Sequence, residues 1–108
     1  MALIFEPKPT PTVEIAGSED RYPINRIYCV GMNYHDHVVE FGSDPEEVDP
    51  VFVMKPADAI VANHEDVPYP PKTNDFHYEI ELVIAMGKQA VNISADEAED
   101  HIYGYAVG

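Results

Sequence analysis

The sequence has few basic residues and almost no cysteine, and both shortages restrict what the chain can be. Its single cysteine, Cys29, cannot form an internal disulfide framework, which is typical of a reducing compartment. Six Lys and Arg stand against twenty Asp and Glu, giving a formal charge of −14. Because this charge repels nucleic acid and anionic lipid, we expect neither as a partner. A small anionic substrate would need a local cation such as a bound metal, Lys55 or Arg26.

The sequence also lacks segments that would target or anchor the chain. No apolar run approaches the roughly 20 residues that a membrane-spanning helix needs. The first seven residues contain no basic region and are interrupted by Glu6 and Pro7, so they do not read as a signal peptide. We therefore expect a cytoplasmic protein without membrane partners.

What is present indicates a folded domain. The chain has 108 residues, 45% of them hydrophobic, with seven Tyr and four Phe. This length supports one domain with a core, and this composition argues against disorder. We expect an α/β or β-rich body.

One stretch, residues 77–86, alternates between apolar and other side chains, which predicts a strand. Glu79 and Glu81 then point to the same face, with Cα atoms about 7 Å apart. Two such anions repel each other unless a cation lies between them, and a divalent ion that prefers oxygen ligands fits best. The alternative is a solvated face of an amphipathic strand, but Val83 and Ala85 continue this face without charge.

The remaining elements are predicted from local patterns. Strands are expected at residues 12–15, at 26–30 ended by Gly31, at 51–56 as a buried strand, at 58–62, and at 102–108. A short helix is expected at residues 33–42, with Asn33 as N-cap, Asp36 closing a capping box and Gly42 at the C′ position. A second capping box, Ser94 with Glu97, predicts a short helix that runs to about His101.

Two further side chains of the first helix could carry chemistry. His37 and Glu40 are three residues apart and share a helical face, so the carboxylate could orient the imidazole for activation of water. The alternative is an incidental pair on a solvent-facing helix. Lys55, at the end of a strand, either holds a substrate carboxylate or extends its amine to solvent.

Taken in order, these pieces resemble the fumarylacetoacetate hydrolase family. The matching segments are residues 26–31, Asn33 and Tyr34 followed by His37 and Glu40, residues 55–59, residues 77–82, and residues 102–108. The resemblance implies an α+β, β-rich fold, part of the family's mixed β-roll with short helices. Residues 1–25 would form an extended lead-in, and residues 26–108 the N-terminal portion of the catalytic domain.

The resemblance also implies a site and a reaction. Family members are metal-dependent hydrolases, decarboxylases, hydratases or isomerases of 2-oxo acids. Glu79 and Glu81 would be two of three carboxylate ligands to Mg²⁺ or Mn²⁺, with Ca²⁺ able to take its place in crystals. His37 and Glu40 would activate water from a lid-like segment, and Lys55 would add positive charge near the site. The likeness is greatest to fumarylpyruvate or acylpyruvate hydrolases of aromatic catabolism, which tend to be homodimers.

The resemblance places the third metal carboxylate after Gly108, so we expect these residues alone to be inactive. Within the family, the alternatives are an oxaloacetate decarboxylase or a 2-oxo acid hydratase or isomerase. An alternative of another class is a non-catalytic acidic domain that pairs with another chain.

Overall fold

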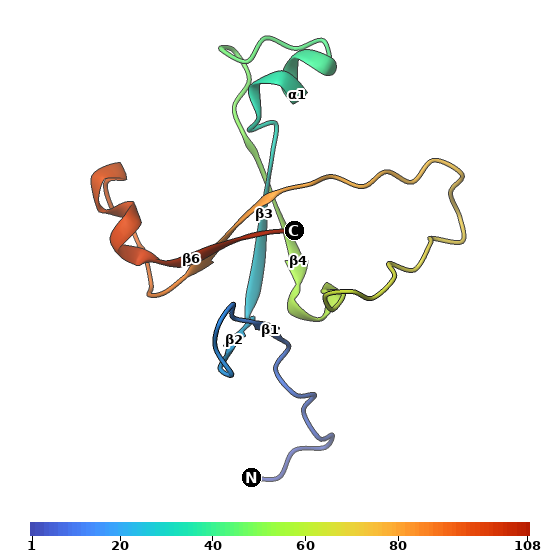
Figure 1. The fold of residues 1–108 in the computed structure, drawn as a ribbon, viewed down its shortest axis with the longest axis vertical. Coiled ribbons are helices and arrows are strands. Elements are labelled where there is room, and N and C mark those ends of the chain that lie inside the picture. Colours follow the sequence, from blue (N-terminus) through green and yellow to red (C-terminus); the bar gives the residue numbers. More distant parts are fainter. The chain divides into compact units, whose positions relative to one another are not determined.

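The computed structural model describes all residues from 1 to 108 as two-stranded ribbons joined by loops and short helices (Figure 1). In chain order the elements are β1 (Thr12–Glu14), β2 (Arg21–Pro23), β3 (Arg26–Gly31), α1 (His35–Glu40), β4 (Val51–Pro56), η1 (Ala57–Ala59), β5 (Leu82–Met86), η2 (Ala95–His101) and β6 (Ile102–Val107). The chain divides into two units, Met1–Val67 and Pro68–Gly108. This content confirms the predicted α+β, β-rich class, and none of the helices has the length and apolarity to span a membrane. The predicted division into a lead-in of residues 1–25 and a catalytic portion of residues 26–108 stays a prediction.

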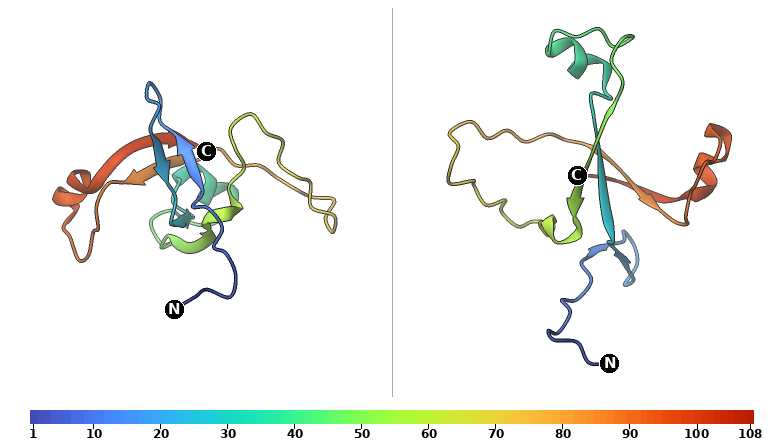
Figure 2. Two further views of the ribbon diagram at one scale, coloured as in Figure 1. Left: turned by 90° about the horizontal axis from the view of Figure 1, so that it is seen from below. Right: turned by 180° about the vertical axis from the view of Figure 1, so that it is seen from behind.

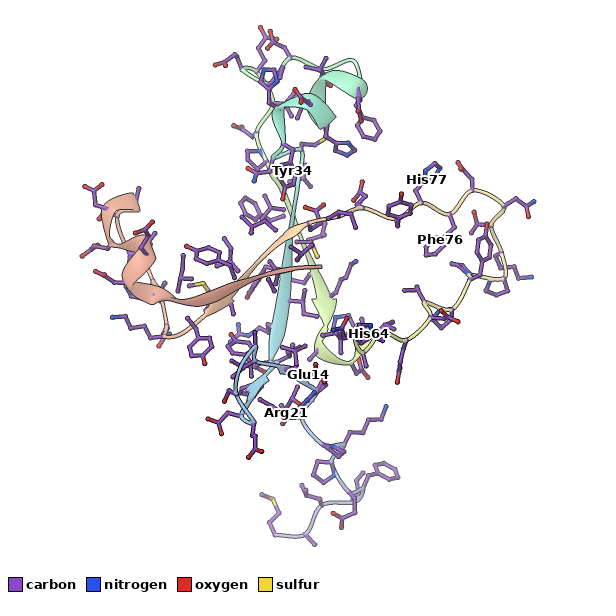
Figure 3. All side chains as sticks on the ribbon, in the orientation of Figure 1. Glu14, Arg21, Tyr34, His64, Phe76 and His77 are labelled. Atoms are coloured by element: carbon purple, nitrogen blue, oxygen red, sulfur yellow. The ribbon has the colours of Figure 1, made fainter.

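The first ribbon pairs β1 with β2 and confirms the strand predicted near residue 12. Arg21 of β2 forms two hydrogen bonds with Thr12 of β1. Its Nε donates to Oγ1 of Thr12 at 2.7 Å, and its Nη2 donates to the carbonyl of Thr12 at 3.1 Å. The Glu14 carboxylate lies 3.9 Å from Nη1 of the same arginine (Figure 3). Gly17, at φ +74°, lies in the turn between the strands, a conformation in which glycine has no steric penalty.

The second ribbon pairs β3 with β4 in an antiparallel register from Arg26 opposite Pro56 to Gly31 opposite Val51. Both strands lie where they were predicted, but the prediction that β4 is buried is wrong, since all six of its residues are exposed. Burial depends on a second layer, and the pairing with β3 is the only extensive contact that β4 makes with another element. Each strand of the ribbon also keeps one edge without a ladder partner.

The helix α1 is shorter than predicted, and its N-terminal cap differs. The N-cap is Tyr34, which makes no side-chain cap hydrogen bond, so the capping roles predicted for Asn33 and Asp36 are wrong. The helix starts one residue later because the carbonyl of Tyr34 accepts the first helical bond, from Val38 at 3.1 Å. With Tyr34 as the N-cap, Asp36 no longer lies at the third helical position that a capping box requires.

The C-terminal end of α1 agrees with the prediction for Gly42. This residue has φ +76°, and its N–H donates to the carbonyl of Val39 at 2.9 Å. The N–H of Ser43 donates to the carbonyl of Val38 at 3.2 Å. These two bonds form a Schellman motif, in which glycine occupies the left-handed position at low cost.

We expect Gly42→Ala to loosen α1 by about 1 kcal/mol, because a Cβ is disfavoured at this φ. A Cβ built at Gly42 meets no atom within 4 Å, so the effect is conformational rather than steric. The amide of Ser43 should then exchange its hydrogen about 5-fold faster, as measured by NMR. Gly104→Ala is the control, because its Cβ also meets nothing within 4 Å and its φ is not positive. Equal exchange in both variants would contradict the assignment of the motif.

The third ribbon pairs β5 with β6 in the second unit (Figure 2). The strand predicted from residue 77 begins only at Leu82, and this part of the prediction is wrong. Glu81 exchanges both backbone hydrogen bonds with Gly108, at 2.8 and 3.0 Å, so the pairing extends one residue beyond the strand. No residue of β6 lies opposite residues 77–80 in the register, and these residues are not in a strand.

Of the two remaining predicted elements, the helix with the capping box is confirmed and the strand at residues 58–62 is wrong. The helix η2 carries the predicted capping box, in which the Ser94 N–H donates to Oε2 of Glu97 at 2.9 Å. The bonds from the backbone and the hydroxyl of Ser94 hold the pKa of the Glu97 carboxyl below its usual value. The strand predicted at 58–62 is wrong, because a 3₁₀ turn, η1, occupies residues 57–59. The ladder with β3 ends at Pro56, and residues 60–62 beyond the turn are not in a strand.

Candidate active site

The helix α1 brings two predicted site residues together. Nδ1 of His37 lies 3.4 Å from Oε2 of Glu40, at the long end of hydrogen-bonding distance. The side chain of His37 is 37% exposed and that of Glu40 75%. A carboxylate facing Nδ1 favours the tautomer with its proton on that nitrogen, which leaves Nε2 as the proton-accepting atom. The arrangement can therefore orient a histidine base.

Phe41 also contacts the His37 ring, a contact that the sequence reasoning missed. The two rings meet edge to face, with centroids 4.8 Å apart and planes at 90°. The signal was available, since residues four apart on a helix lie over one another. Phe41 is the C-cap of α1, and its own N–H donates to the carbonyl of His37 at 3.3 Å. The imidazole is thus positioned by one polar and one apolar neighbour.

The two predicted metal ligands lie at the start of the third ribbon. Glu81 is half-buried and held by its backbone bonds to Gly108, whereas Glu79 is exposed and lies before the ladder. Carboxylate oxygens are the donors that Mg²⁺ and Mn²⁺ prefer, so the donor chemistry fits a hard divalent ion. Nowhere in the chain do three or more His, Cys, Asp or Glu side chains converge in a way that could hold a metal. The chain offers two donors of such a site, and their role remains a prediction.

The ribbon face that carries Glu81 is lined by small residues. In the register, Glu81 faces Gly108, and the next pairs on that face join Val83 with Ala106 and Ala85 with Gly104. Side chains alternate between faces along a strand, so the larger residues of β5 and β6 lie on the opposite face. No bulky cross-strand neighbour therefore flanks the Glu81 carboxylate.

A second His–carboxylate contact precedes the glutamates, and sequence reasoning missed it too. A ring nitrogen of His77, Nε2, contacts Oδ1 of Asp75. His77 is labelled in Figure 3. Asp75, His77, Glu79 and Glu81 are each two residues apart, a spacing that places side chains on one side of an extended chain. The predicted alternation thus had one further polar member, Asp75, upstream of residues 77–86.

Lys55 lies away from the helix that carries His37. It pairs with Ile27 in the register, four residues from the Gly31–Val51 pair at which β3 leads into α1. Four residues of strand correspond to about 13 Å along the ribbon. His37, Glu40 and Lys55 belong to the first unit, and Glu79 and Glu81 to the second.

Comparison with known proteins identifies the family. The family model described as "Fumarylacetoacetate (FAA) hydrolase C-terminal" matches residues 26–108. The chain belongs to the fumarylacetoacetate hydrolase family. This result confirms the resemblance found in the sequence and the expected fold class.

Two solved structures of this family resemble the chain over almost its whole length. The fumarylpyruvate hydrolase of Pseudomonas aeruginosa, crystallised with Mn²⁺ and pyruvate, is 44% identical with a TM-score of 0.92, over 98% of this chain and 47% of that one. A structure from Burkholderia cenocepacia is 43% identical with a TM-score of 0.81, over 99% of this chain and 45% of that one. The Mn²⁺ in the Pseudomonas structure supports a divalent metal in this branch of the family.

The chain also matches curated members of the fumarylacetoacetate hydrolase family that are named as oxaloacetate tautomerases. The oxaloacetate tautomerase YisK of Bacillus subtilis is 37% identical over 92 residues, and the human mitochondrial oxaloacetate tautomerase FAHD2B is 35% identical over 83 residues. The match covers 79% and 77% of this chain, but only 29% and 26% of those proteins. The chain spans between 26% and 36% of the length of the curated relatives that it matches.

Proposed function

We propose that this chain carries the water-activating pair and two metal ligands of a hydrolase that cleaves a C–C bond in an acylpyruvate-type 2-oxo acid. The observation that supports this most is its similarity, over 98% of its length, to a fumarylpyruvate hydrolase solved with Mn²⁺ and pyruvate. Pyruvate is the fragment that such a cleavage releases. The His37–Glu40 contact supplies the base that hydrolysis requires.

In this proposal the residues of α1 move the protons. Nε2 of His37 takes a proton from water, and Glu40 stabilises the imidazolium that forms. The hydroxide adds to the carbonyl carbon distal to the carboxylate of the substrate. The C–C bond then breaks, its electron pair passes to pyruvate enolate, and the proton held by His37 can return to that carbon.

Glu79 and Glu81 would hold the divalent ion, Mg²⁺ or Mn²⁺, together with donors from outside this chain. When bound, such an ion supplies a Lewis acid that polarises the 2-oxo acid and favours charge on the departing enolate. The half-buried position of Glu81 and the small residues around it leave this carboxylate open to a ligand. Lys55 would act only as a source of positive charge at a distance from α1.

The second candidate is an oxaloacetate tautomerase, which the names of the Bacillus and human relatives favour. Tautomerisation moves one proton between carbon and oxygen and adds no water. The same metal and base could serve it, so the distinction lies in the products.

The proposal can be tested in a chimera in which this chain replaces the matching part of the Pseudomonas enzyme. We expect the chimera to release pyruvate from fumarylpyruvate in a Mn²⁺-dependent reaction. The pyruvate is measured in a coupled lactate dehydrogenase assay. The chain alone and the chimera treated with chelator are the controls, and both should be inactive. Rapid ketonisation of enol-oxaloacetate without cleavage of fumarylpyruvate would instead assign the tautomerase activity.

A further inference from the structure

We propose that Gly108 is a positioning residue for Glu81, and that the side chain of Val83 is the reason why glycine is needed at position 108. The three residues lie in one ribbon, β5–β6, and share one of its faces. The inference rests on the proposed function in one respect, which is that Glu81 is taken as a ligand of the divalent ion. It concerns the geometry of that ligand and adds no step to the reaction.

The backbone of Glu81 is held by Gly108. The N–H of Glu81 donates to the carbonyl of Gly108 at 2.8 Å, and the N–H of Gly108 donates to the carbonyl of Glu81 at 3.0 Å. Two residues that exchange both bonds lie directly opposite each other in an antiparallel ladder, with Cα atoms about 5.5 Å apart. A displacement of Gly108 therefore also displaces the backbone from which the Glu81 carboxylate extends.

A side chain at position 108 would collide with Val83. Val83 lies opposite Ala106 in the register, so it is a diagonal neighbour of Gly108 on the shared face. A Cβ built on Gly108 lies 2.7 Å from Cγ2 of Val83. Carbon atoms in contact normally lie about 3.5 to 4.0 Å apart, so the overlap amounts to roughly 1 Å.

The collision cannot be relieved cheaply by the valine side chain. A β-branched residue is restricted at χ1, so its methyl groups do not swing aside as the end of a long side chain would. The strain then falls on the backbone of position 108 and on its two hydrogen bonds with Glu81. A side chain at 108 would also stand directly beside the Glu81 carboxylate, with Cβ atoms about 5 Å apart.

Gly104 shows that this requirement belongs to position 108 and not to the strand as a whole. It lies on the same face of β6, opposite Ala85. A Cβ built there meets no atom within 4 Å. Neither glycine has a positive φ, so backbone conformation requires glycine at neither position. The difference between the two lies in the neighbour that a side chain would meet.

The chimera with the Pseudomonas enzyme provides the test. Gly108→Ala should weaken Mn²⁺ binding by about 10- to 100-fold in calorimetric titration, the range for residues that orient a metal ligand. In the metal-free chimera the Glu81 amide should exchange its hydrogen at least about 10-fold faster, because its acceptor is the carbonyl of Gly108. Gly104→Ala, about 13 Å along the strand, is the matched control and should change neither quantity.

A second substitution tests the collision itself. Val83→Ala removes the methyl group that the new Cβ would meet. Combined with Gly108→Ala, it should restore Mn²⁺ affinity to within about 3-fold of the chimera without substitutions, since the two residues are in contact and their effects are not additive. Val83→Ala alone should leave the affinity unchanged.

The dependence of pyruvate release on Mn²⁺ separates positioning from loss of fold. In Gly108→Ala the Mn²⁺ concentration for half-maximal release should rise in proportion to the loss of affinity, and turnover at saturating Mn²⁺ should be retained. A fall in turnover at saturating Mn²⁺, with the half-maximal concentration unchanged, would make Gly108 a structural residue only and overturn the proposal.

Three other results would also overturn it. These are normal Mn²⁺ affinity in Gly108→Ala where Glu81→Gln has lost it, equal losses in Gly108→Ala and Gly104→Ala, and failure of Val83→Ala to restore the double variant. Normal Mn²⁺ affinity in Glu81→Gln would remove the metal role of Glu81, and this inference with it. The expected changes in affinity and exchange, in a chimera that releases no pyruvate, would support the inference and count against the proposed reaction only.

Discussion

In the chimera with the Pseudomonas enzyme, Glu81→Gln and Glu79→Gln should each lower Mn²⁺-dependent pyruvate release by at least about 100-fold. Replacing even a residue that only hydrogen-bonds to a metal ligand typically lowers metal affinity or activity by about 10- to 100-fold. An amide keeps the size of the side chain but removes the negative charge that attracts a hard cation. Calorimetric titration with Mn²⁺ should show the same order of loss in affinity.

Glu99→Gln is the matched control for this experiment. Glu99 is an exposed carboxylate in the same unit, on η2, and the substitution makes the same chemical change. Because the Glu81 backbone is bonded to Gly108, its variant should keep the ribbon intact. Normal turnover and normal Mn²⁺ affinity in both site variants would show that these carboxylates are surface charges.

His37→Ala should lower the turnover number of the chimera by about 100- to 10,000-fold, the range that a positioned general base contributes. Its affinity for Mn²⁺ should change little, because the proposal gives His37 no part in holding the metal. Glu40→Gln should have a smaller effect, since it removes only the partner that orients the ring. Turnover and Mn²⁺ binding are measured on the same preparations.

His35→Ala serves as the control for the base. His35 is exposed on the same helix and also contacts a carboxylate, that of Asp36, at 3.3 Å. A general effect of losing a histidine from α1 would appear in both variants. If His37→Ala turned over normally while His35→Ala did not, the base would have to be reassigned.

Features that depend on neighbours in the sequence were predictable. The contact between His37 and Glu40 follows from a three-residue spacing on a helix, and the glycine cap at residue 42 from a local backbone preference. The capping box of Ser94 and Glu97 is of the same kind, as are the strand regions with β-branched and aromatic residues.

Features that depend on distant parts of the chain were not predictable. The sequence of β4 is apolar enough for a core, yet whether it is buried depends on a layer that does not adjoin it in the sequence. The strand predicted from residue 77 begins only at Leu82, because its extent is set by the pairing with β6 and not by local composition alone. The same limit applies to the proposed metal site, whose two predicted donors lie two residues apart in the sequence and whose further donors would come from elsewhere.

The ribbons have one more consequence, which concerns the behaviour of the chain in solution. A strand with an unpaired edge is a template for adding another strand. The net negative charge of this chain opposes aggregation, because electrostatic repulsion between two copies keeps their strand edges apart. Repulsion of this kind reaches only about 8 Å at physiological ionic strength and weakens as salt is added. The acidic side chains would thus also slow aggregation through the unpaired strand edges.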